Sequence, residues 1–396
     1  MKRSNDDVGQ NGATLGVSTE GGIKKLKDSC ENGYSQTTKN GKNSTKIITE
    51  TWTSEIKMLQ DNCVPGNVGK ALKRPPTDGI SSVTFPENND KLLMATSWDK
   101  HAYIYDVESN ELITSFNLYS PLLDGCFENA AIGYIGGADG RLHKLDLVAK
   151  VKTLCGSHEK GISCVKFLDS RKVPITGSWD KTMKIWDPID NSQKPQCVKL
   201  TSKAISMDTS GNYIGVAQSD RIVEFFDVRR LDTPFHRMKS SLQLATRCIR
   251  FSPRSTNYAL SSIEGRIAIE SFDLNPEKRA SAYKIRCHLR KADDGFDSYP
   301  VNALCFNHHN GTLLSGGGDG EVCIWDIKEA KRIHRYGGYP TSISDIAVTT
   351  NGKYLAVASS YTWEQGNKEH PLDNLYIHSL EEDLQALGLA SENNEA

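Results

Sequence analysis

One tripeptide, Ser-Trp-Asp, occurs twice in this chain, and each copy opens a run that ends in an aromatic residue followed by Asp. Ser97-Trp98-Asp99 leads to Tyr105-Asp106, and Ser178-Trp179-Asp180 leads to Trp186-Asp187. A third run, SGGGDGEVCIWD, ends at Trp325-Asp326 and has no tryptophan in its turn. An internal repeat constrains the fold more than any other feature, because each copy marks one supersecondary unit.

The spacing of the repeats is that of a propeller blade. The Asp residues that close the runs follow one another at steps of 40, 41, 40, 46 and 53 residues, and a degenerate last run ends near His378: Asp106, Asp146, Asp187, Asp227, Asp273 and Asp326. A unit of about 40–45 residues with a Trp-Asp signature forms a four-stranded blade. Segments such as ISCVKFL and VPITGS are short, β-prone and bounded by turn residues. The sequence therefore predicts an all-β fold, a seven-bladed WD-repeat β-propeller.

We expect three parts in the chain. Residues 71–380 are predicted to form the ring, and a strand around Ala71–Arg74 is predicted to close the last blade, because an open ring leaves unpaired strand edges. Residues 1–70 form a polar, mostly disordered extension with too little apolar surface to fold. Its apolar residues Ile47, Ile48, Trp52 and Ile56 are either a docking motif or a stray patch. Residues 381–396 form an acidic tail.

Composition excludes several classes of function. The 48 basic and 49 acidic residues give a net charge of −1, which does not favour nucleic-acid binding. The 10 cysteines include no Cys-x-x-Cys pair, so buried free thiols are favoured over metal ligands, and free thiols indicate a reducing compartment. We find no signal peptide and no apolar run of membrane-spanning length. A cytosolic or nuclear protein without membrane partners is expected.

The third blade carries a combination that could be mistaken for a catalytic triad. In WD-repeat blades a His, a Ser or Thr, the turn Asp and the strand Trp form a buried hydrogen-bonded chain, which here predicts a structural tetrad of His158, Thr176, Asp180 and Trp186. A hydrolase is disfavoured because there is no nucleophile elbow Gly-x-Ser-x-Gly. No phosphate loop or zinc motif occurs either. We predict no enzyme activity, no cofactor, no metal site and no small-molecule substrate.

Blade topology places two tryptophans on one face of the ring. Strands a to d of a blade run antiparallel from the channel outwards, so the start of a, the b–c turn, the start of c and the end of d lie together. Trp98 and Trp179 lie in b–c turns and belong on this b–c face. Each tryptophan either packs on the neighbouring turn or anchors a partner peptide, since Trp is enriched at binding hot spots.

The fifth blade adds three arginines to the b–c face. Arg247 lies at the start of strand a, Arg266 opens strand c after the Glu264-Gly265 turn, and Arg286 lies near the end of strand d. Converging guanidinium groups suit carboxylates or phosphate. The alternative is that each arginine pairs internally, for instance with Glu264 or Glu270.

Several stretches carry a family resemblance. GSHEKGISCVKFLDSRKVPITGSWDKTMKIWDP, KSSLQLATRCIRFSPRSTNYALSSIEGRIAIESF and the closing ASSYTWEQGNKEHP resemble the Bub-three mitotic checkpoint proteins, over about residues 71–380. The sister family of Rae/Gle messenger-RNA export propellers is the alternative. The runs YPTSI and EHPLDNLYI favour the checkpoint branch, whereas SSYTW leans towards the export branch.

The resemblance implies a non-catalytic spindle assembly checkpoint adaptor at the kinetochore, in the nucleus and also in the cytoplasm. Its implied partners are checkpoint kinases and pseudokinases of the Bub/Mad class, bound through a short helical motif, and phosphorylated Met-Glu-Leu-Thr repeats of the kinetochore scaffold. Direct nucleic-acid binding is not expected on this branch; the export branch would instead bind a nucleoporin motif and capture RNA. By motif, the helical segment would meet Trp98, Trp179, Arg247 and Arg266, and the phosphothreonine would meet Arg266 and Arg286.

Overall fold

The computed structural model describes residues 63–65, 68–187, 194–253, 255–279, 282–293 and 295–386. By its contacts the chain divides into residues 1–54 and 55–396, and every described residue belongs to the second unit. The predicted disordered extension, apart from residues 63–65 and 68–70, lies outside the described residues, and so do residues 387–396 of the tail.

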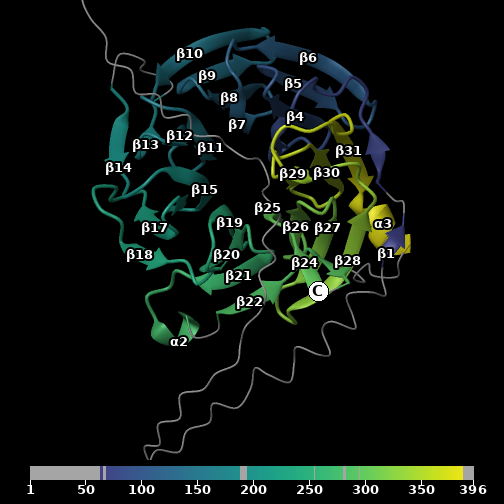
Figure 1. Ribbon diagram of the computed structural model, residues 1–396. Coiled ribbons are helices and arrows are strands. Elements are labelled where there is room, and N and C mark those ends of the chain that lie inside the picture. The colour runs from purple at the N-terminus through teal and green to yellow at the C-terminus, as the bar shows by residue number, and fades with distance from the viewer. Residues whose placement is uncertain are drawn as a thin grey trace, which may run out of the picture. The chain divides into compact units, whose positions relative to one another are not determined.

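Seven sheets, each built on four antiparallel strands, are arranged in a ring, which confirms the predicted seven-bladed propeller (Figure 1). Side chains of their innermost strands line a central channel, among them Ser81, Asp124 and Asp345. Blade 1 consists of β3 (Ile80–Thr84), β4 (Leu92–Ser97), β5 (His101–Asp106) and β6 (Glu111–Asn117). Blade 2 consists of β7 (Leu122–Asn129), β8 (Ile132–Gly137), β9 (Arg141–Asp146) and β10 (Val151–Ser157). Blade 3 consists of β11 (Ile162–Leu168), β12 (Val173–Ser178), β13 (Thr182–Ile185) and β14 (Gln196–Lys199).

The remaining blades follow the same order from the channel outwards. Blade 4 consists of β15 (Ala204–Ser210), β16 (Tyr213–Gln218), β17 (Ile222–Asp227) and β18 (His236–Lys239). Blade 5 consists of β19 (Thr246–Phe251), β20 (Asn257–Ser262), β21 (Arg266–Ser271) and β22 (Tyr283–Arg286). Blade 6 consists of β25 (Val301–Phe306), β26 (Leu313–Gly317), β27 (Val322–Asp326) and β28 (Lys331–Gly337). Blade 7 consists of β29 (Ile343–Val348), β30 (Tyr354–Ser359), β31 (Asn374–Ser379) and β2 (Lys70–Ala71).

The ring closes in blade 7, where the first strand of the ring pairs with the last. Lys70 of β2 stands opposite Ile377 of β31, and the Leu72 N–H donates to the Leu375 carbonyl at 2.8 Å. The predicted closing strand is therefore confirmed, although the strand itself begins one residue earlier than expected. A further strand, β1 (Cys63–Pro65), lies parallel to the outer edge of β28 in blade 6.

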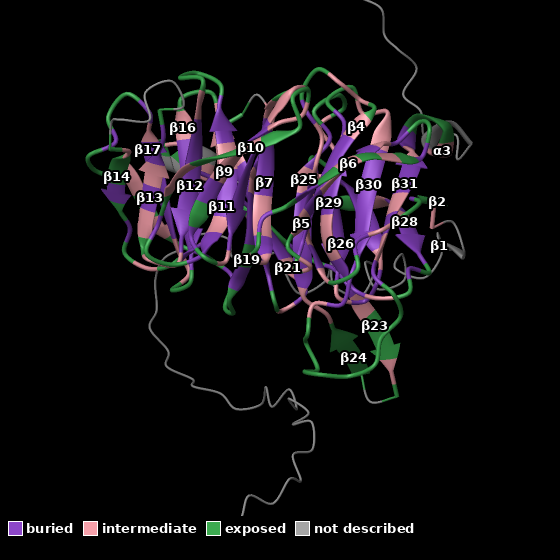
Figure 2. Ribbon diagram, turned by 90° about the horizontal axis from the view of Figure 1, so that it is seen from above, coloured by how far each residue is buried: buried purple, intermediate pink, exposed green. Residues whose placement is uncertain are grey.

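Two insertions explain why the step between Asp273 and Asp326, at 53 residues, is the longest of the repeat. Helix α2 (Pro276–Arg279) follows strand c of blade 5, and the hairpin of β23 (Leu289–Ala292) and β24 (Gly295–Ser298) lies between blades 5 and 6. Figure 2 shows this hairpin projecting from one face of the ring. A short helix, α3 (Leu380–Ala386), follows β31 at the start of the acidic tail.

The hydrophobic core lies between the blades. One cluster of buried side chains fills each of the seven junctions, including Ile214 and Phe226 between blades 3 and 4 and Trp325 between blades 5 and 6. Because a blade packs on both faces, strands such as β12 (VPITGS) are almost wholly buried, whereas the outer strand β10 is mostly exposed (Figure 2). This burial on both faces is the reason why the inner strands lack a clear polar alternation.

Polar side chains of the innermost strands join adjacent blades around the channel. At three junctions a serine or asparagine side chain donates a hydrogen bond of 2.8–3.0 Å to the first carbonyl of the next blade: Ser81 to Leu122, Ser163 to Ala204 and Asn302 to Ile343. At three others an aspartate accepts a backbone N–H of the next blade at 2.7–2.9 Å: Asp124 from Val165, Asp208 from Phe251 and Asp345 from Val83. At the remaining junction, between blades 5 and 6, Arg247 donates to Asn302.

One of these aspartates is expected to destabilise the ring at neutral pH. Burial raises the pKa of Asp345 to about 6, and the nearby guanidinium of Arg250 offsets only part of that effect. A carboxyl whose folded pKa exceeds its unfolded value of about 3.9 weakens the fold above the folded pKa, and the penalty disappears as the pH falls to the unfolded value.

We therefore expect Asp345→Asn, which keeps an acceptor for the Val83 N–H, to raise the free energy of unfolding by about 1–3 kcal/mol at pH 7.5. The gain should shrink below pH 6 and vanish near pH 4, since both forms of the side chain are then neutral. Urea unfolding of the two chains across this pH range measures the difference. Equal stability at pH 7.5 would contradict the expectation.

Candidate peptide-binding face

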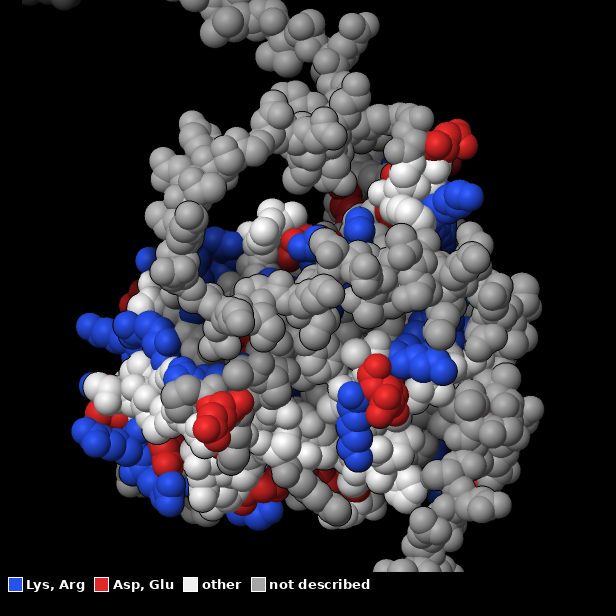
Figure 3. Space-filling model, turned by 90° about the horizontal axis from the view of Figure 1, so that it is seen from below, with Lys and Arg blue, Asp and Glu red and all other residues white. Residues whose placement is uncertain are grey.

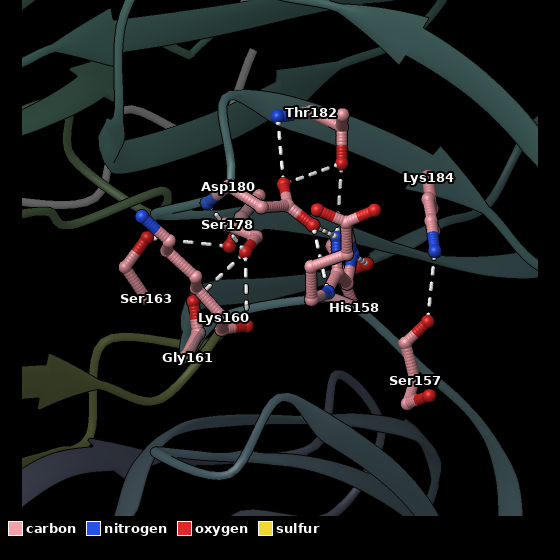
Figure 4. A network of polar contacts seen from close by, with 12 residues as sticks. Ser157, His158, Lys160, Gly161, Ser163, Ser178, Asp180, Thr182 and Lys184 are labelled. Carbon is pink, nitrogen blue, oxygen red and sulfur yellow. Dashed lines mark hydrogen bonds and ion pairs between the residues drawn. The ribbon is translucent and has the colours of Figure 1, made fainter.

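The four residues of the predicted tetrad form one hydrogen-bonded chain in blade 3. Figure 4 shows His158 and Asp180 of this chain with the polar residues around them. The Trp186 indole N–H donates to the Thr176 hydroxyl at 2.8 Å, and that hydroxyl lies 2.7 Å from His158 Nε2. On its other side, His158 Nδ1 lies 2.9 Å from an Asp180 carboxylate oxygen. Because the Asp180 carboxylate can only accept, the proton of the neutral ring lies on Nδ1, and Nε2 accepts the Thr176 hydroxyl proton.

The chemistry of the tetrad is structural. Burial lowers the pKa of His158, although Asp180 acts in the opposite direction, so the neutral ring is favoured near pH 7. Both ring nitrogens of His158 and the indole N–H of Trp186 have partners within the tetrad, and the Thr176 hydroxyl is buried between His158 and Trp186. A hydroxyl held in this way is not exposed for attack on a substrate.

A second tetrad, which the sequence analysis missed, lies in blade 6. His288 Nδ1 lies 2.9 Å from Asp319, His288 Nε2 lies 2.9 Å from the Ser315 hydroxyl, and Trp325 Nε1 donates to the same hydroxyl at 2.9 Å. His288 precedes its aspartate by 31 residues, compared with 22 in blade 3. The hairpin β23–β24 accounts for the longer separation, and the Ile-Trp-Asp run that ends at Asp326 is the signal that could have prompted the search.

The two turn tryptophans both pack on their own blade and remain accessible. Trp98 is 48% exposed and lies over Gly79, where an added Cβ would come 3.5 Å from the indole. Trp179 is half-buried over Gly161, where an added Cβ would come 2.8 Å from the ring. Each tryptophan therefore packs on a glycine of its own blade, and its role as an anchor for a partner peptide stays a prediction.

Arg266 and Arg286 stand directly opposite each other on β21 and β22. Side chains in such a pair lie on the same side of the sheet, and like charges directly opposite destabilise it. Both lie on the side of Ala268, which packs against blade 4. Arg266 makes one long ion pair with Glu264, at 3.4 Å, and among the described residues none forms a side-chain hydrogen bond or ion pair with the Arg286 guanidinium. The pair thus carries two positive charges and one nearby negative charge.

Arg247 lies at the same end of blade 5 but is directed towards blade 6. Its guanidinium donates to the Asn302 side-chain oxygen at 2.9 and 3.3 Å. Desolvation lowers the pKa of Arg247, and Glu364 only partly opposes this effect. No carboxylate in the described ranges forms an ion pair with it, so this cation at the mouth of the channel has a neutral amide as its hydrogen-bond partner.

Arg250, three residues further along the same strand, has acidic side chains nearby, unlike Arg247, whose partner is an amide. Desolvation acts to lower its pKa, but Cys248, Asp208 and Asp345 together raise it above the usual range. The charge of Arg250 is therefore offset by acidic side chains inside the channel, whereas Arg247 forms no ion pair with a described residue. The arginines predicted for the site thus share one face and lie on two sides of blade 5.

Other kinds of site find little support in the described residues. They contain no group of three or more His, Cys, Asp or Glu side chains placed to hold a metal ion. Neither of their helices is long and apolar enough to cross a membrane. Figure 3 shows basic and acidic side chains interspersed over one side of the molecule, without the field of a single sign that nucleic-acid surfaces carry.

Comparison with known proteins assigns the family. The model for the WD domain, G-beta repeat, matches residues 69–106, 149–187 and 288–326. Mitotic checkpoint protein BUB3.1 of Arabidopsis thaliana is 40% identical over 325 residues, which cover 81% of this chain and 95% of the relative. The chain belongs to the Bub3 family.

Further relatives place it within that family. Mitotic checkpoint protein bub3 of Dictyostelium discoideum is 40% identical over 312 residues, covering 78% of this chain and 94% of the relative. The mRNA export factor GLE2 of Chaetomium thermophilum is 29% identical over 308 residues, covering 74% of this chain and 85% of the relative. The Bub3 relatives thus match more strongly than the export branch, as the sequence motifs indicated.

Proposed function

We propose that this Bub3-family chain is a non-catalytic adaptor of the spindle assembly checkpoint, acting at the kinetochore and present in the nucleus and cytoplasm. Its b–c face binds the short helical motif of checkpoint kinases and pseudokinases through Trp98, Trp179, Arg247 and Arg266. Arg266 and Arg286 bind the phosphothreonine of Met-Glu-Leu-Thr repeats on the kinetochore scaffold. The names of the mitotic checkpoint relatives support the checkpoint role.

The observation that carries the phosphate assignment is the register of Arg266 and Arg286. Two guanidinium groups on the same side of a sheet repel each other, and among the described residues one carboxylate, that of Glu264, forms an ion pair with them. A phosphothreonine brings a charge of about −1.5 to −2 and three acceptor oxygens. Each charge-assisted hydrogen bond contributes roughly 1.5–3 kcal/mol, so phosphorylation of the repeat can switch binding on.

A titration with two peptides tests this function. Calorimetry of the full chain with a phosphorylated Met-Glu-Leu-Thr peptide should give binding at least tenfold tighter than with the unphosphorylated peptide. The same affinity for both peptides would overturn the phosphate assignment.

The export branch remains a second candidate, because GLE2 is similar over most of the ring. That function predicts capture of a nucleoporin motif and of RNA. A pull-down in which the kinase motif and the nucleoporin motif compete for the chain separates the two candidates: preference for the nucleoporin motif favours export.

Glu264 is expected to limit the affinity for phosphate. Its carboxylate accepts the Gln243 N–H at 2.9 Å with one oxygen and faces Arg266 with the other. Glu264→Gln keeps an acceptor for Gln243 and removes the charge that competes with the phosphate. We expect about threefold tighter binding of the phosphopeptide and unchanged binding of the unphosphorylated one, measured by fluorescence anisotropy. Weaker phosphopeptide binding would show that Glu264 supports the site instead.

A further inference from the structure

One motif of the sequence, SSYTWEQGNKEHP, has no part in the functions above. It forms the loop of residues 360–373 between β30 and β31, drawn in yellow over blade 7 in Figure 1. Trp363 in this loop is 58% exposed and has a φ of 61°. A bulky residue in the left-handed region is an outlier that the surrounding structure must hold in place, and such outliers cluster at functional sites.

The loop holds this tryptophan on a rigid support. The Tyr361 N–H donates to Asp373 at 3.0 Å, and its hydroxyl donates to the Gly366 carbonyl at 3.1 Å and accepts the Gln365 N–H at 2.9 Å. The rings of Tyr361 and Trp363 are stacked with centroids 6.3 Å apart. Because the support is already ordered, a ligand that contacts Trp363 loses little free energy to ordering it.

The position of the loop connects it with the proposed peptide-binding face. At its start, Ser360 accepts the Ile80 N–H of blade 1 at 2.9 Å, next to Gly79, on which Trp98 rests. Further along, Glu364 lies over the b–c turn of blade 6, where a Cβ added to Gly318 would come 3.2 Å from its carboxylate. The same carboxylate acts on the pKa of Arg247. The loop thus extends from the Trp98 turn to the arginine at the channel mouth.

Gly318 occupies the turn position at which blades 1 and 3 have Trp98 and Trp179. The b–c turn of blade 6 therefore carries no tryptophan of its own, and the loop of blade 7 that covers this turn carries one. We propose that Trp363 is a third aromatic anchor of this face. It takes an apolar side chain of the same partner segment whose acidic residues meet Arg247, an inference that rests on the proposed function.

The chemistry of the partner follows from the neighbouring charges. Arg247 forms no ion pair in the described part of the chain, and Glu364 offsets only part of its desolvation, so we expect the segment to place an acidic residue near it. Trp363 presents a large apolar surface that a leucine, isoleucine, methionine or phenylalanine side chain can cover. Trp is among the residues most enriched at binding hot spots, where truncation removes a large share of the affinity.

The experiment uses Trp363→Asn and Trp363→Phe in the full chain, with a peptide that carries the kinase motif as the probe. Asn tolerates the left-handed region, so Trp363→Asn should leave the melting temperature unchanged or raise it while the affinity falls at least tenfold. Trp363→Phe should retain part of the affinity. A purely structural role predicts that stability and affinity fall together, and that result would overturn the inference.

Val148 offers a control on the other side of the ring. It is an exposed apolar residue, 80% accessible, in the turn between β9 and β10 of blade 2, and so lies at the end of the ring opposite the b–c face. Val148→Asn should leave the affinity unchanged. If Arg247→Gln weakens binding and Trp363→Asn does not, the inference fails while the proposed function stands. If the unaltered chain does not bind the peptide, the proposed function fails, and the inference fails with it.

Discussion

Arg266→Ala is expected to weaken binding of the phosphorylated Met-Glu-Leu-Thr peptide by about 2–4 kcal/mol, roughly 30- to 700-fold. Arg266 is half-buried beside Arg286, and its loss leaves one guanidinium to meet a doubly charged phosphate. The fold should persist, because the side chain makes only one long ion pair in the unbound ring. Calorimetric titration of the variant and the parent measures the difference.

Arg229→Ala is the control for this prediction. Arg229 is an exposed arginine paired with Asp227 in blade 4, after strand c, and so lies at the end of the ring opposite the b–c face. It should bind the phosphopeptide as the parent does. Equal losses for Arg229→Ala and Arg266→Ala would indicate a general effect of charge, and no loss for Arg266→Ala would reject the phosphate site.

Asp180→Ala is expected to lower the free energy of unfolding by about 3–5 kcal/mol. The Asp180 carboxylate meets His158 at 2.9 Å, the Thr182 hydroxyl at 2.6 Å and the Glu159 N–H at 3.1 Å. Alanine leaves these groups without their acceptor in a buried turn, and an unsatisfied buried donor costs more than a hydrogen bond contributes. Urea unfolding, followed by tryptophan fluorescence, measures the loss.

Asp220→Ala provides the comparison within the same ring. Asp220 occupies the corresponding b–c turn of blade 4, but its carboxylate accepts only the Ile222 N–H, at 3.1 Å, and it is exposed. Its replacement should cost less than about 1 kcal/mol. Equal losses in the free energy of unfolding for the two variants would show that an aspartate in the b–c turn stabilises a blade without the hydrogen bonds of the tetrad.

The fold could be predicted because its units repeat in the sequence. Each blade brings its own Trp-Asp or similar run, and the step of about 40 residues between Asp106, Asp146 and Asp187 fixes the number of strands per blade. The common face of Trp98, Trp179 and the blade 5 arginines followed from antiparallel order alone. Local spacing also brought together His158 and Asp180, since no insertion separates them.

The details that sequence left open depend on side-chain direction and on insertions. Antiparallel order puts Arg247 and Arg266 at one end of blade 5 but does not say towards which neighbouring blade each extends. The structure shows that Arg247 extends towards Asn302 of blade 6, whereas Arg266 lies on the side of Ala268, which packs against blade 4. The second tetrad was hidden because a hairpin separates His288 from Asp319. Exposure of Trp363 depends on how one long loop folds back on Tyr361, which no periodic pattern encodes.

The closure of blade 7 has a consequence for how the protein is made. Because β2 must pair with β31, the strand that opens the ring leaves the ribosome long before its partner is made. Until then the incomplete ring has two edge strands with unpaired backbone groups, and these can pair wrongly with strands of another nascent chain. A polypeptide that ends before Asn374 lacks β31 and cannot close blade 7. Arrest of translation near the end of the chain therefore gives an aggregation-prone product rather than a shorter functional protein.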